Sequence, residues 1–129
     1  MAKWVASGVL DSGLNYIKSN ATKMYLIKAY AAGDTYATVL SNALNAGVTM
    51  SSTDYTLGNG ASSARTLTTA TGKQDSATAG SGATPNLHIA FTDGSANVLW
   101  VTDETTDQVI TSGNTLVFPA ITYTSNQPT

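Results

Sequence analysis

Residues 85–123 constrain the fold most, because they form short apolar runs separated by turn-forming residues. At the start of this stretch Leu87, Ile89 and Phe91 alternate with smaller or polar residues, which is the period-2 pattern of a half-buried strand. The sequence Asp-Gly-Ser at 93–95 follows and predicts a turn between two apolar runs. The stretch therefore begins as an antiparallel pair of strands.

Further strands are expected after this turn, each preceded by a polar or glycine-containing stretch. They are expected at 98–101, 108–110 and 116–118, with a turn at 112–114 before the last of them. Pro119 cannot donate a hydrogen bond to a neighbouring strand, so it marks an edge or a bulge before a final strand at 121–123. Together these strands predict an antiparallel meander.

The first half of the chain has helical periodicity instead. Residues 7–20 place Leu10, Leu14 and Ile17 at i, i+4 and i+7, which predicts a helix with one apolar stripe. Three residues are expected to favour its ends, namely Ser7 as N-cap, Asp11 in the first turn and Lys18 in the last turn.

A second helix is predicted over residues 35–45, with Asp34 as its N-cap and Gly47 as its stop. Its apolar face is formed by Tyr36, Val39, Leu40, Ala43 and Leu44. Residues 24–30, between the two helices, are apolar on both faces of a strand, so they predict a central strand.

Beyond residue 48 the helical periodicity ends. Short strands are expected at 53–57 and 64–71, whereas 72–85 is dominated by Gly, Ser, Ala and Thr and is expected to be a surface segment with little core contact. We expect residues 1–129 to form a single domain that is mainly β with two N-terminal helices, an α+β fold. An antiparallel β-sandwich of about seven strands is the expected closure.

Charged residues make up only 11% of the 129 residues, against about a quarter in typical domains, and the net charge is −2. The chain has no basic stripe, so nucleic acid is not an expected partner. No apolar run approaches the roughly 18 residues of a membrane span, and no membrane partner is expected. Because charge usually opposes association, its scarcity favours a surface that is partly an interface.

The sequence predicts no catalytic residue, no cofactor and no metal site. His88 is the only histidine and has no ligand or nucleophile at a recognisable spacing, so a solvated or satisfied strand histidine is expected. Asp103, Glu104 and Asp107 match no calcium loop and are expected to form a solvated acidic loop. The glycine pairs at 58–60 and 80–82 precede no helical pattern, so they predict turns rather than phosphate cradles.

Five residues are predicted to contribute to a subunit interface, namely Arg65, Trp100, Val98, Val117 and Trp4. Arg65 stands in a Ser/Thr-rich strand, where it pairs with a carboxylate or a carbonyl oxygen of its own chain or contacts another subunit. Trp100 lies in a run that is apolar on both faces, which favours core or interface over a sugar-stacking platform. The cover for such strands comes either from the N-terminal helices or from a neighbouring subunit.

A resemblance to a known family spans nearly the whole chain. The chain resembles a family of small structural proteins from the virions of tailed bacteriophages, and the order and spacing of its segments carry the likeness. The segments run from Val9 to Met24, Thr35 to Ala37, Asp54 to Leu57, Arg65 to Thr68, Leu99 to Thr102 and Leu116 to Ala120. The chain departs from the family at Ala64, where Gly is usual, and residues 72–85 match nothing in it.

The resemblance implies a non-enzymatic structural protein, specifically a capsid decoration (cement) protein that binds the outer surface of the head and stabilises it. The implied partners are the major capsid protein and further copies of the chain, with a trimer as the implied homo-oligomer. The implied location is the virion, assembled in the host cytoplasm. Two alternatives stay open, a tail-tube or tail-end component and a carbohydrate-binding module, and an enzyme is the least favoured class.

Overall fold

The computed structural model describes residues 2–83, 86–104 and 108–129. Its helices are α1 (Ser7–Asn20) and α2 (Tyr36–Ser41), and two single 3-10 turns are η1 (Ser52–Asp54) and η2 (Ala61–Ser63). The strands are β1 (Lys23–Ile27), β2 (Val48–Thr49), β3 (Tyr55–Asn59), β4 (Arg65–Thr69), β5 (Lys73–Ser76), β6 (His88–Thr92), β7 (Val98–Asp103), β8 (Thr115–Phe118) and β9 (Thr122–Ser125). All paired strands run antiparallel, so the predicted mainly β class is confirmed.

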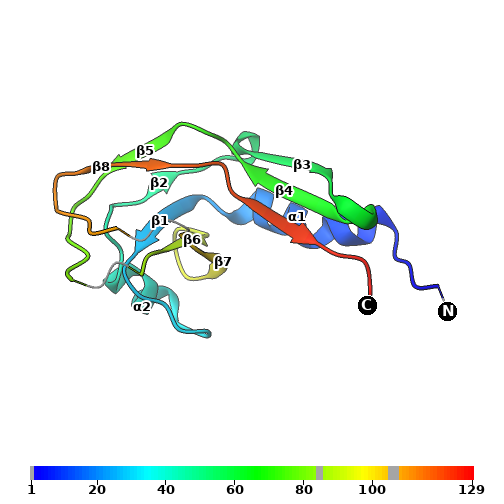
Figure 1. The fold of residues 1–129 in the computed structure, drawn as a ribbon, viewed down its shortest axis with the longest axis horizontal. Helices are drawn as coiled ribbons and strands as arrows, with labels where there is room; N and C mark the ends of the chain where they lie inside the picture. The colour runs from blue at the N-terminus through cyan, green and yellow to red at the C-terminus, as the bar shows by residue number, and fades with distance from the viewer. Residues whose placement is uncertain (1, 84–85, 105–107) are drawn as a thin grey trace.

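Over the described ranges the strands form three open sheets, as Figure 1 shows. A four-stranded sheet has the order β2-β1-β6-β7, a three-stranded sheet has the order β3-β4-β9, and β5 pairs with β8. The chain passes from β4 to β5 and from β8 to β9, so the β5–β8 pair continues the layer of the three-stranded sheet. Because the sheets are open, they establish the antiparallel β fold but not a closed sandwich.

The main core lies between these layers and joins every sheet. Leu14 and Ile17 of α1 pack in it with Leu67 of β4 and with Met24 and Phe91 of the four-stranded sheet. The predicted stripe of α1 is therefore confirmed, and its third member, Leu10, is buried as well. The helix fills the space beside the four-stranded sheet and under β4, where Figure 1 shows the two side by side.

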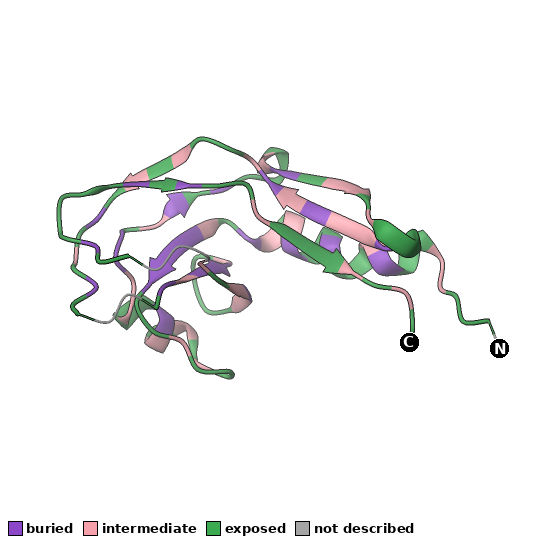
Figure 2. Cartoon of the chain, viewed as in Figure 1, coloured by how far each residue is buried: buried purple, intermediate pink, exposed green. Residues whose placement is uncertain are grey.

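A second, smaller core explains why β1, β6 and β7 carry apolar residues on both faces. Tyr25, Ile27 and Ala90 pack with Val39 of α2 on the face of the four-stranded sheet that is turned away from the main core. Val98 and Val101 of β7 pack against the same cluster. The cover for this face therefore includes α2, and Figure 2 shows the resulting continuous burial along β1.

The bounds of α1 agree with the predicted 7–20, but the capping residues of both helices differ from the sequence prediction. The N-cap of α1 is Ala6 without a side-chain hydrogen bond, so Ser7 is not the cap, and Asp11 lies beyond the first turn. The N-cap of α2 is Thr35, whose Oγ1 accepts a hydrogen bond from Thr38 N at 3.3 Å, and not Asp34.

The second helix is also shorter than the predicted 35–45, because residues after Ser41 form hydrogen bonds and bridges with strand residues. Ala43 forms an isolated bridge with Ile27, and Leu44 N donates to Leu26 O at 2.8 Å. Asn45 is buried and its Oδ1 accepts from Leu26 N at 2.9 Å. These contacts replace helical hydrogen bonds with sheet-like ones, which helical periodicity cannot reveal.

The described residues of the segment 72–85 lie mostly at the surface, as their composition predicts, but the segment is attached to the fold more firmly than expected. It contains β5, which pairs along its whole length with β8. Ala77 is buried in the main core, and Ser81 Oγ accepts a hydrogen bond from the buried Ile110 N at 2.8 Å. The composition of the segment does not predict this strand, because strand pairing uses backbone N–H and C=O groups, which every residue type except proline supplies in full. Residues 84–85 of the predicted segment lie outside the described residues.

The predicted meander holds only for its first hairpin, β6–β7, at the Asp93 turn. Beyond it, β8 pairs with β5 and β9 pairs with β4, so the later strands return to earlier parts of the chain. Residues 108–110 form no strand, although Ile110 is buried in the main core. The other predicted strands occur with boundaries shifted by a few residues.

Candidate functional site

Trp4 and Val117, two of the five predicted interface residues, lie at the surface, with exposed fractions of 73% and 64%. Trp4 belongs to the arm before α1, which the C-terminal tail holds in place. Val5 N donates to Gln127 Oε1 at 2.8 Å, and Gln127 Nε2 donates to Val5 O and to Ser63 O, both at 3.0 Å. A reciprocal pair of hydrogen bonds therefore fixes the backbone of the residue that follows Trp4.

Arg65 is engaged within its own chain. Its Nε lies 2.7 Å from Asp11 Oδ1, and its Nη1 donates to Asn59 Oδ1. The side chains of Arg65 and Asp11 are only 18% and 19% exposed. This pair connects α1 to the three-stranded sheet. Of the alternatives that the sequence left open for Arg65, the structure shows pairing with a carboxylate of its own chain.

Trp100 and Val98 lie mostly inside the molecule. Trp100 is 8% exposed and stacks on Phe91, with ring centroids 4.5 Å apart and an interplanar angle of 12°. The edge of Tyr123 meets the same indole at 5.5 Å and 85°. Because Trp100 is buried and packs against these two rings, it offers little surface for stacking on a sugar. Val98 packs against the smaller core.

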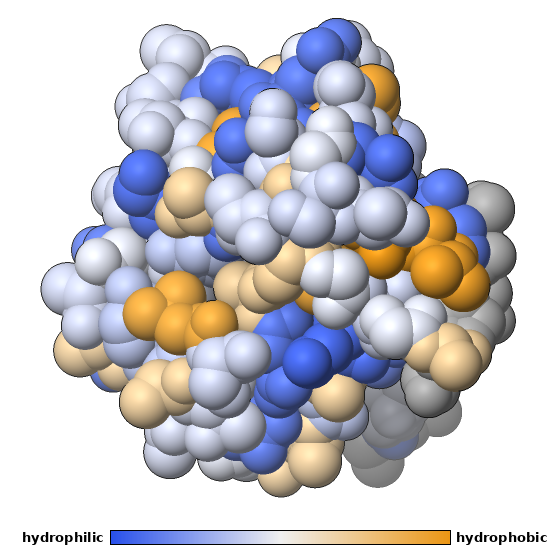
Figure 3. Space-filling model, turned by 90° about the vertical axis from the view of Figure 1, so that its left-hand side faces the viewer, coloured by the Kyte–Doolittle hydropathy of each residue, from blue (hydrophilic) through white to orange (hydrophobic). Residues whose placement is uncertain are grey.

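Further exposed apolar side chains are not among the five residues predicted for the interface. Val9 and Tyr16, seven residues apart, share an exposed side of α1 that lies beside its buried stripe. Val109 and Tyr123 are also exposed. On the face that Figure 3 shows, apolar side chains form separate patches in a mostly hydrophilic or neutral surface. Helical periodicity could have identified the α1 pair.

The described residues also line two neighbouring hollows that meet at Glu104. The first has a volume of about 230 Å³, and its lining is Leu26, Glu104, Gln108, Ile110, Thr115, Leu116, Val117 and Phe118. The second has a volume of about 210 Å³, and its lining is Ile89, Thr102, Asp103, Glu104, Pro119, Ala120, Ile121 and Thr122. Both combine apolar side chains with carboxylates from the end of β7.

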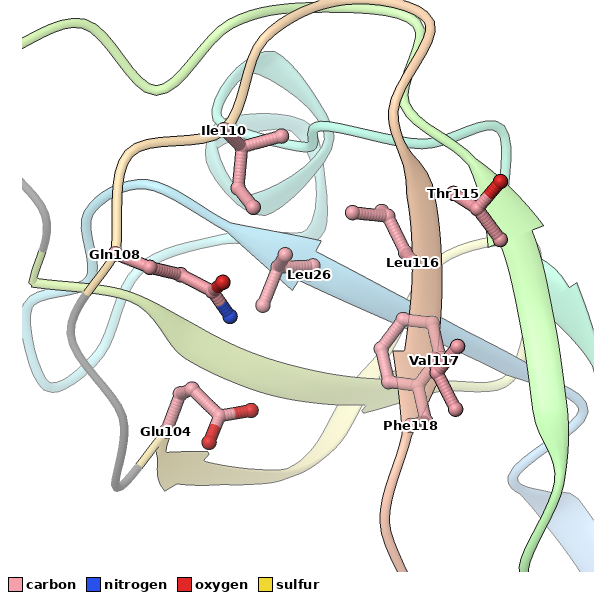
Figure 4. Close-up of a pocket in the computed structure, with 8 residues that line it drawn as sticks. All are labelled: Leu26, Glu104, Gln108, Ile110, Thr115, Leu116, Val117 and Phe118. Carbon is pink, nitrogen blue, oxygen red and sulfur yellow. The ribbon is translucent and has the colours of Figure 1, made fainter.

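Figure 4 shows how the first hollow is built. The carboxylate of Glu104 and the amide of Gln108 are turned towards the space that Leu26, Leu116 and Phe118 border on the other side. A backbone hydrogen bond fixes the position of the Glu104 main chain, because Glu104 N donates to Leu87 O at 2.9 Å. The acidic loop 103–107 was expected to be merely solvated, and its member Asp107 lies outside the described residues.

His88 pairs with a carboxylate across the β6–β7 ladder. Its Nε2 lies 2.9 Å from Asp103 Oδ1, and its side chain is 17% exposed. Nδ1 is buried and has no hydrogen-bond partner among the residues described, and the ring of Tyr30 lies 6.2 Å away. Within the described ranges no three metal-ligating side chains come together. This arrangement is that of a histidine held in a strand pair by one partner.

Comparisons with protein-family models, curated proteins and solved structures find no match for this chain. Neither helix of the described chain is long and apolar enough to cross a membrane. The functional argument therefore rests on the residues and their arrangement.

Proposed function

We propose that this chain is a structural protein of a tailed-bacteriophage virion, and specifically a capsid decoration protein that binds the outer surface of the head. The resemblance of its sequence to small virion proteins supports this function. The resembling segments fall on α1, β3, β4, β7 and β8, together with the first residues of α2. The likeness therefore concerns the elements that build the two cores, not a single loop.

The observation that carries the proposal is the exposure of large apolar side chains on elements whose core-facing side is already filled. Val9 and Tyr16 face outwards on α1, and Val117 faces outwards on β8 between buried Leu116 and Phe118. Trp4 adds the most exposed large apolar side chain of the described chain. Covering such surface with a neighbouring subunit contributes about 25 cal/mol for each Å² of apolar area removed from water.

The proposed mechanism is extended contact with neighbouring capsid subunits. Exposed apolar anchors would pack into the shell, and the uncharged polar residues around them would form the rim of the interface. The proposal includes the finer fold, in which the four-stranded sheet and the layer of β5, β8 and the three-stranded sheet act as two halves of a sandwich. It also includes the major capsid protein as partner and assembly as a trimer, which follows the family resemblance.

Electron microscopy of the parent particle tests the location. Density of this fold on the head lattice supports decoration, density along the tail supports a tail component instead, and absence from the particle refutes both. A glycan array tests the remaining alternative, since specific sugar binding that requires Trp4 would favour a carbohydrate-binding module.

Interface variants test the mechanism. Combining Trp4→Ser with Val117→Ser should weaken attachment to heads that lack the protein, because it removes two exposed anchors without opening a core. Leu40→Ser is the matched control, since it alters an exposed apolar residue on α2 that the proposal does not use. Equal attachment of the double variant and the wild type would contradict the role of these anchors.

A further inference from the structure

The strand β9 lies at an edge of the three-stranded sheet and is exposed along most of its length. It is the orange-red arrow beside β4 in Figure 1, and Figure 2 shows its exposure. Its sequence, Thr-Tyr-Thr-Ser, contains neither a charged residue nor a proline. Natural proteins usually protect an edge strand by charge, proline, a bulge, short length or burial, because its unpaired backbone groups can pair with another chain.

The other edges of the described sheets carry such protection. The strand β2 is only two residues long, and β5 contains Lys73 and Asp75. The strand β7 ends in Asp103, and its ladder with β6 has a register shift. The strand β3 begins with buried Tyr55, and β8 is followed directly by Pro119. Among the described edge strands, β9 is therefore the least protected.

The hydrogen bonds between β4 and β9 show which backbone groups of β9 are free. Thr69 N donates to Ile121 O at 2.9 Å, so these two residues form a hydrogen-bonded pair. In an antiparallel ladder such pairs alternate with non-hydrogen-bonded pairs. In the observed register Thr122 and Thr124 belong to the second kind, so their N–H and C=O groups point away from β4. No described residue forms a hydrogen bond with these backbone groups.

A second copy of the same strand complements these groups. The sequence around Tyr123 is symmetric, with a threonine on each side. When two β9 strands run antiparallel about a two-fold axis at Tyr123, Thr122 of one copy lies opposite Thr124 of the other. Each such pair exchanges both of its backbone hydrogen bonds. The two Tyr123 side chains, each 41% exposed in the single chain, then face each other as an aromatic cross-strand pair, which stabilises a sheet.

We propose that two copies of this chain associate through β9 in this register, so that their three-stranded sheets join into one continuous sheet. Because β9 has no charged side chain, the pairing brings no like charges together. It also extends a row of threonines, in which Thr68 Oγ1 and Thr122 Oγ1 already lie 3.0 Å apart. The contact is two-fold, so it is distinct from the proposed trimer contact. Only its place between neighbouring subunits on the shell rests on the proposed function.

Cysteine cross-linking tests the register, because the chain contains no cysteine of its own. Across the two-fold axis the two Tyr123 Cα atoms lie about 4.5 Å apart, within the range that a disulfide bridges. Oxidised Tyr123→Cys should therefore become a disulfide-linked dimer. Ser125→Cys is the matched control on the same face of β9, since its two copies lie roughly 13 Å apart along the strands and cannot be bridged. Equal cross-linking of the two variants, or none in Tyr123→Cys, would overturn the proposal.

Sedimentation of the purified full chain tests the free N–H groups. The wild type should pass from monomer to dimer with a Kd on the order of 10⁻⁴ M, because one short strand pair is a small interface. Thr124→Pro removes an N–H that points away from β4, so the fold should persist while the dimer weakens by roughly 20-fold or more. Thr124→Ala keeps the N–H and should weaken the dimer only about three-fold.

Two results of this experiment contradict the proposal. One is a wild type that stays monomeric at about ten times the expected Kd. The other is equal association of Thr124→Pro and Thr124→Ala, with circular dichroism showing that both variants keep the fold. If Thr124→Pro does not fold, the comparison of Tyr123→Cys with Ser125→Cys decides.

Particle images separate this inference from the proposed function. Decorated heads on which neighbouring copies join at β9 support both. If decorated heads leave β9 unpaired, its place on the shell is wrong and the decoration function stands. If the wild type is absent from the virion but Tyr123→Cys forms the dimer, the decoration function fails and the β9 contact stands.

Discussion

Replacing Asn45 by alanine tests the reasoning about the second helix most directly. Asn45 is 3% exposed and joins three parts of the chain. Its Oδ1 accepts from Leu26 N at 2.9 Å, and its Nδ2 donates to Asp75 Oδ2 at 2.9 Å and to Met24 O at 3.4 Å. The side chain therefore links the exit of α2 to β1 and to β5.

The expected cost follows from the groups that lose a partner. The buried Leu26 N–H is left without its acceptor, which costs about 1–3 kcal/mol, and the bond to the Asp75 carboxylate contributes about another 1 kcal/mol because that site is partly exposed. The contact with Met24 O is long, at 3.4 Å, and adds little to this cost. The free energy of unfolding should fall by about 3 kcal/mol, which corresponds to a decrease in Tm of roughly 10 °C for a domain of this size.

Urea unfolding monitored by the fluorescence of Trp100 and by circular dichroism measures this cost. Asn15→Ala is the matched control, because Asn15 is exposed on α1 and alanine favours helices, so its effect should stay within about 0.5 kcal/mol. An Asn45→Ala protein that loses less than about 1 kcal/mol, with an unchanged dependence on urea, would refute the view that this side chain replaces helical hydrogen bonds.

Three further predictions concern buried contacts, ionisation and the β5 strand. Tyr55→Phe should lower the free energy of unfolding by about 1–2 kcal/mol, because the buried hydroxyl donates to Ala21 O at 2.8 Å and the carbonyl loses this donor. Acid should destabilise the fold below about pH 4. Burial raises the pKa of Asp54, but hydrogen bonds from Lys73 and Ser51 outweigh the effect of burial and lower that pKa. The pKa of Asp93 is lowered as well, because backbone N–H groups of its turn donate to the carboxylate. A carboxyl whose pKa is lower in the folded than in the unfolded chain stabilises the fold above its unfolded value of about 3.9, and this contribution is lost as the pH falls through the folded pKa. Deleting residues 73–76 should cause a large loss of stability, because β8 loses its paired strand.

Each of these outcomes has a direct check. Thermal melting of Tyr55→Phe at the wild-type Tm would contradict the role of its hydroxyl. Urea titrations between pH 2 and pH 6 should show a smaller loss of stability for Asp93→Asn than for the wild type, and parallel curves would contradict the assignment to Asp93. A melting temperature unchanged by the deletion of 73–76 would restore the original expectation that this segment is weakly attached.

Local patterns in the sequence determined the elements that depend on neighbours within a few residues. The spacing of Leu10, Leu14 and Ile17 predicts the buried face of α1, since one helical stripe needs one surface to cover it. The Asp93 carboxylate accepts hydrogen bonds from the backbone of 95–97, and Gly94 has a φ of +79°, so the β6–β7 turn follows from its own residues.

Tertiary structure alone decided the pairing of distant strands and the composition of the hollow. The partner of β8 is β5, a polar stretch whose backbone bonds carry no signature in side-chain hydrophobicity. The helix α2 stops before Asn45, whose side chain forms hydrogen bonds with Leu26 of β1 and Asp75 of β5. Glu104 lines one hollow with Leu26 and Phe118 for the same reason, since only the folded chain brings the residue after β7 near β1 and β8. Local sequence patterns report local geometry, whereas these contacts join residues that are far apart along the chain.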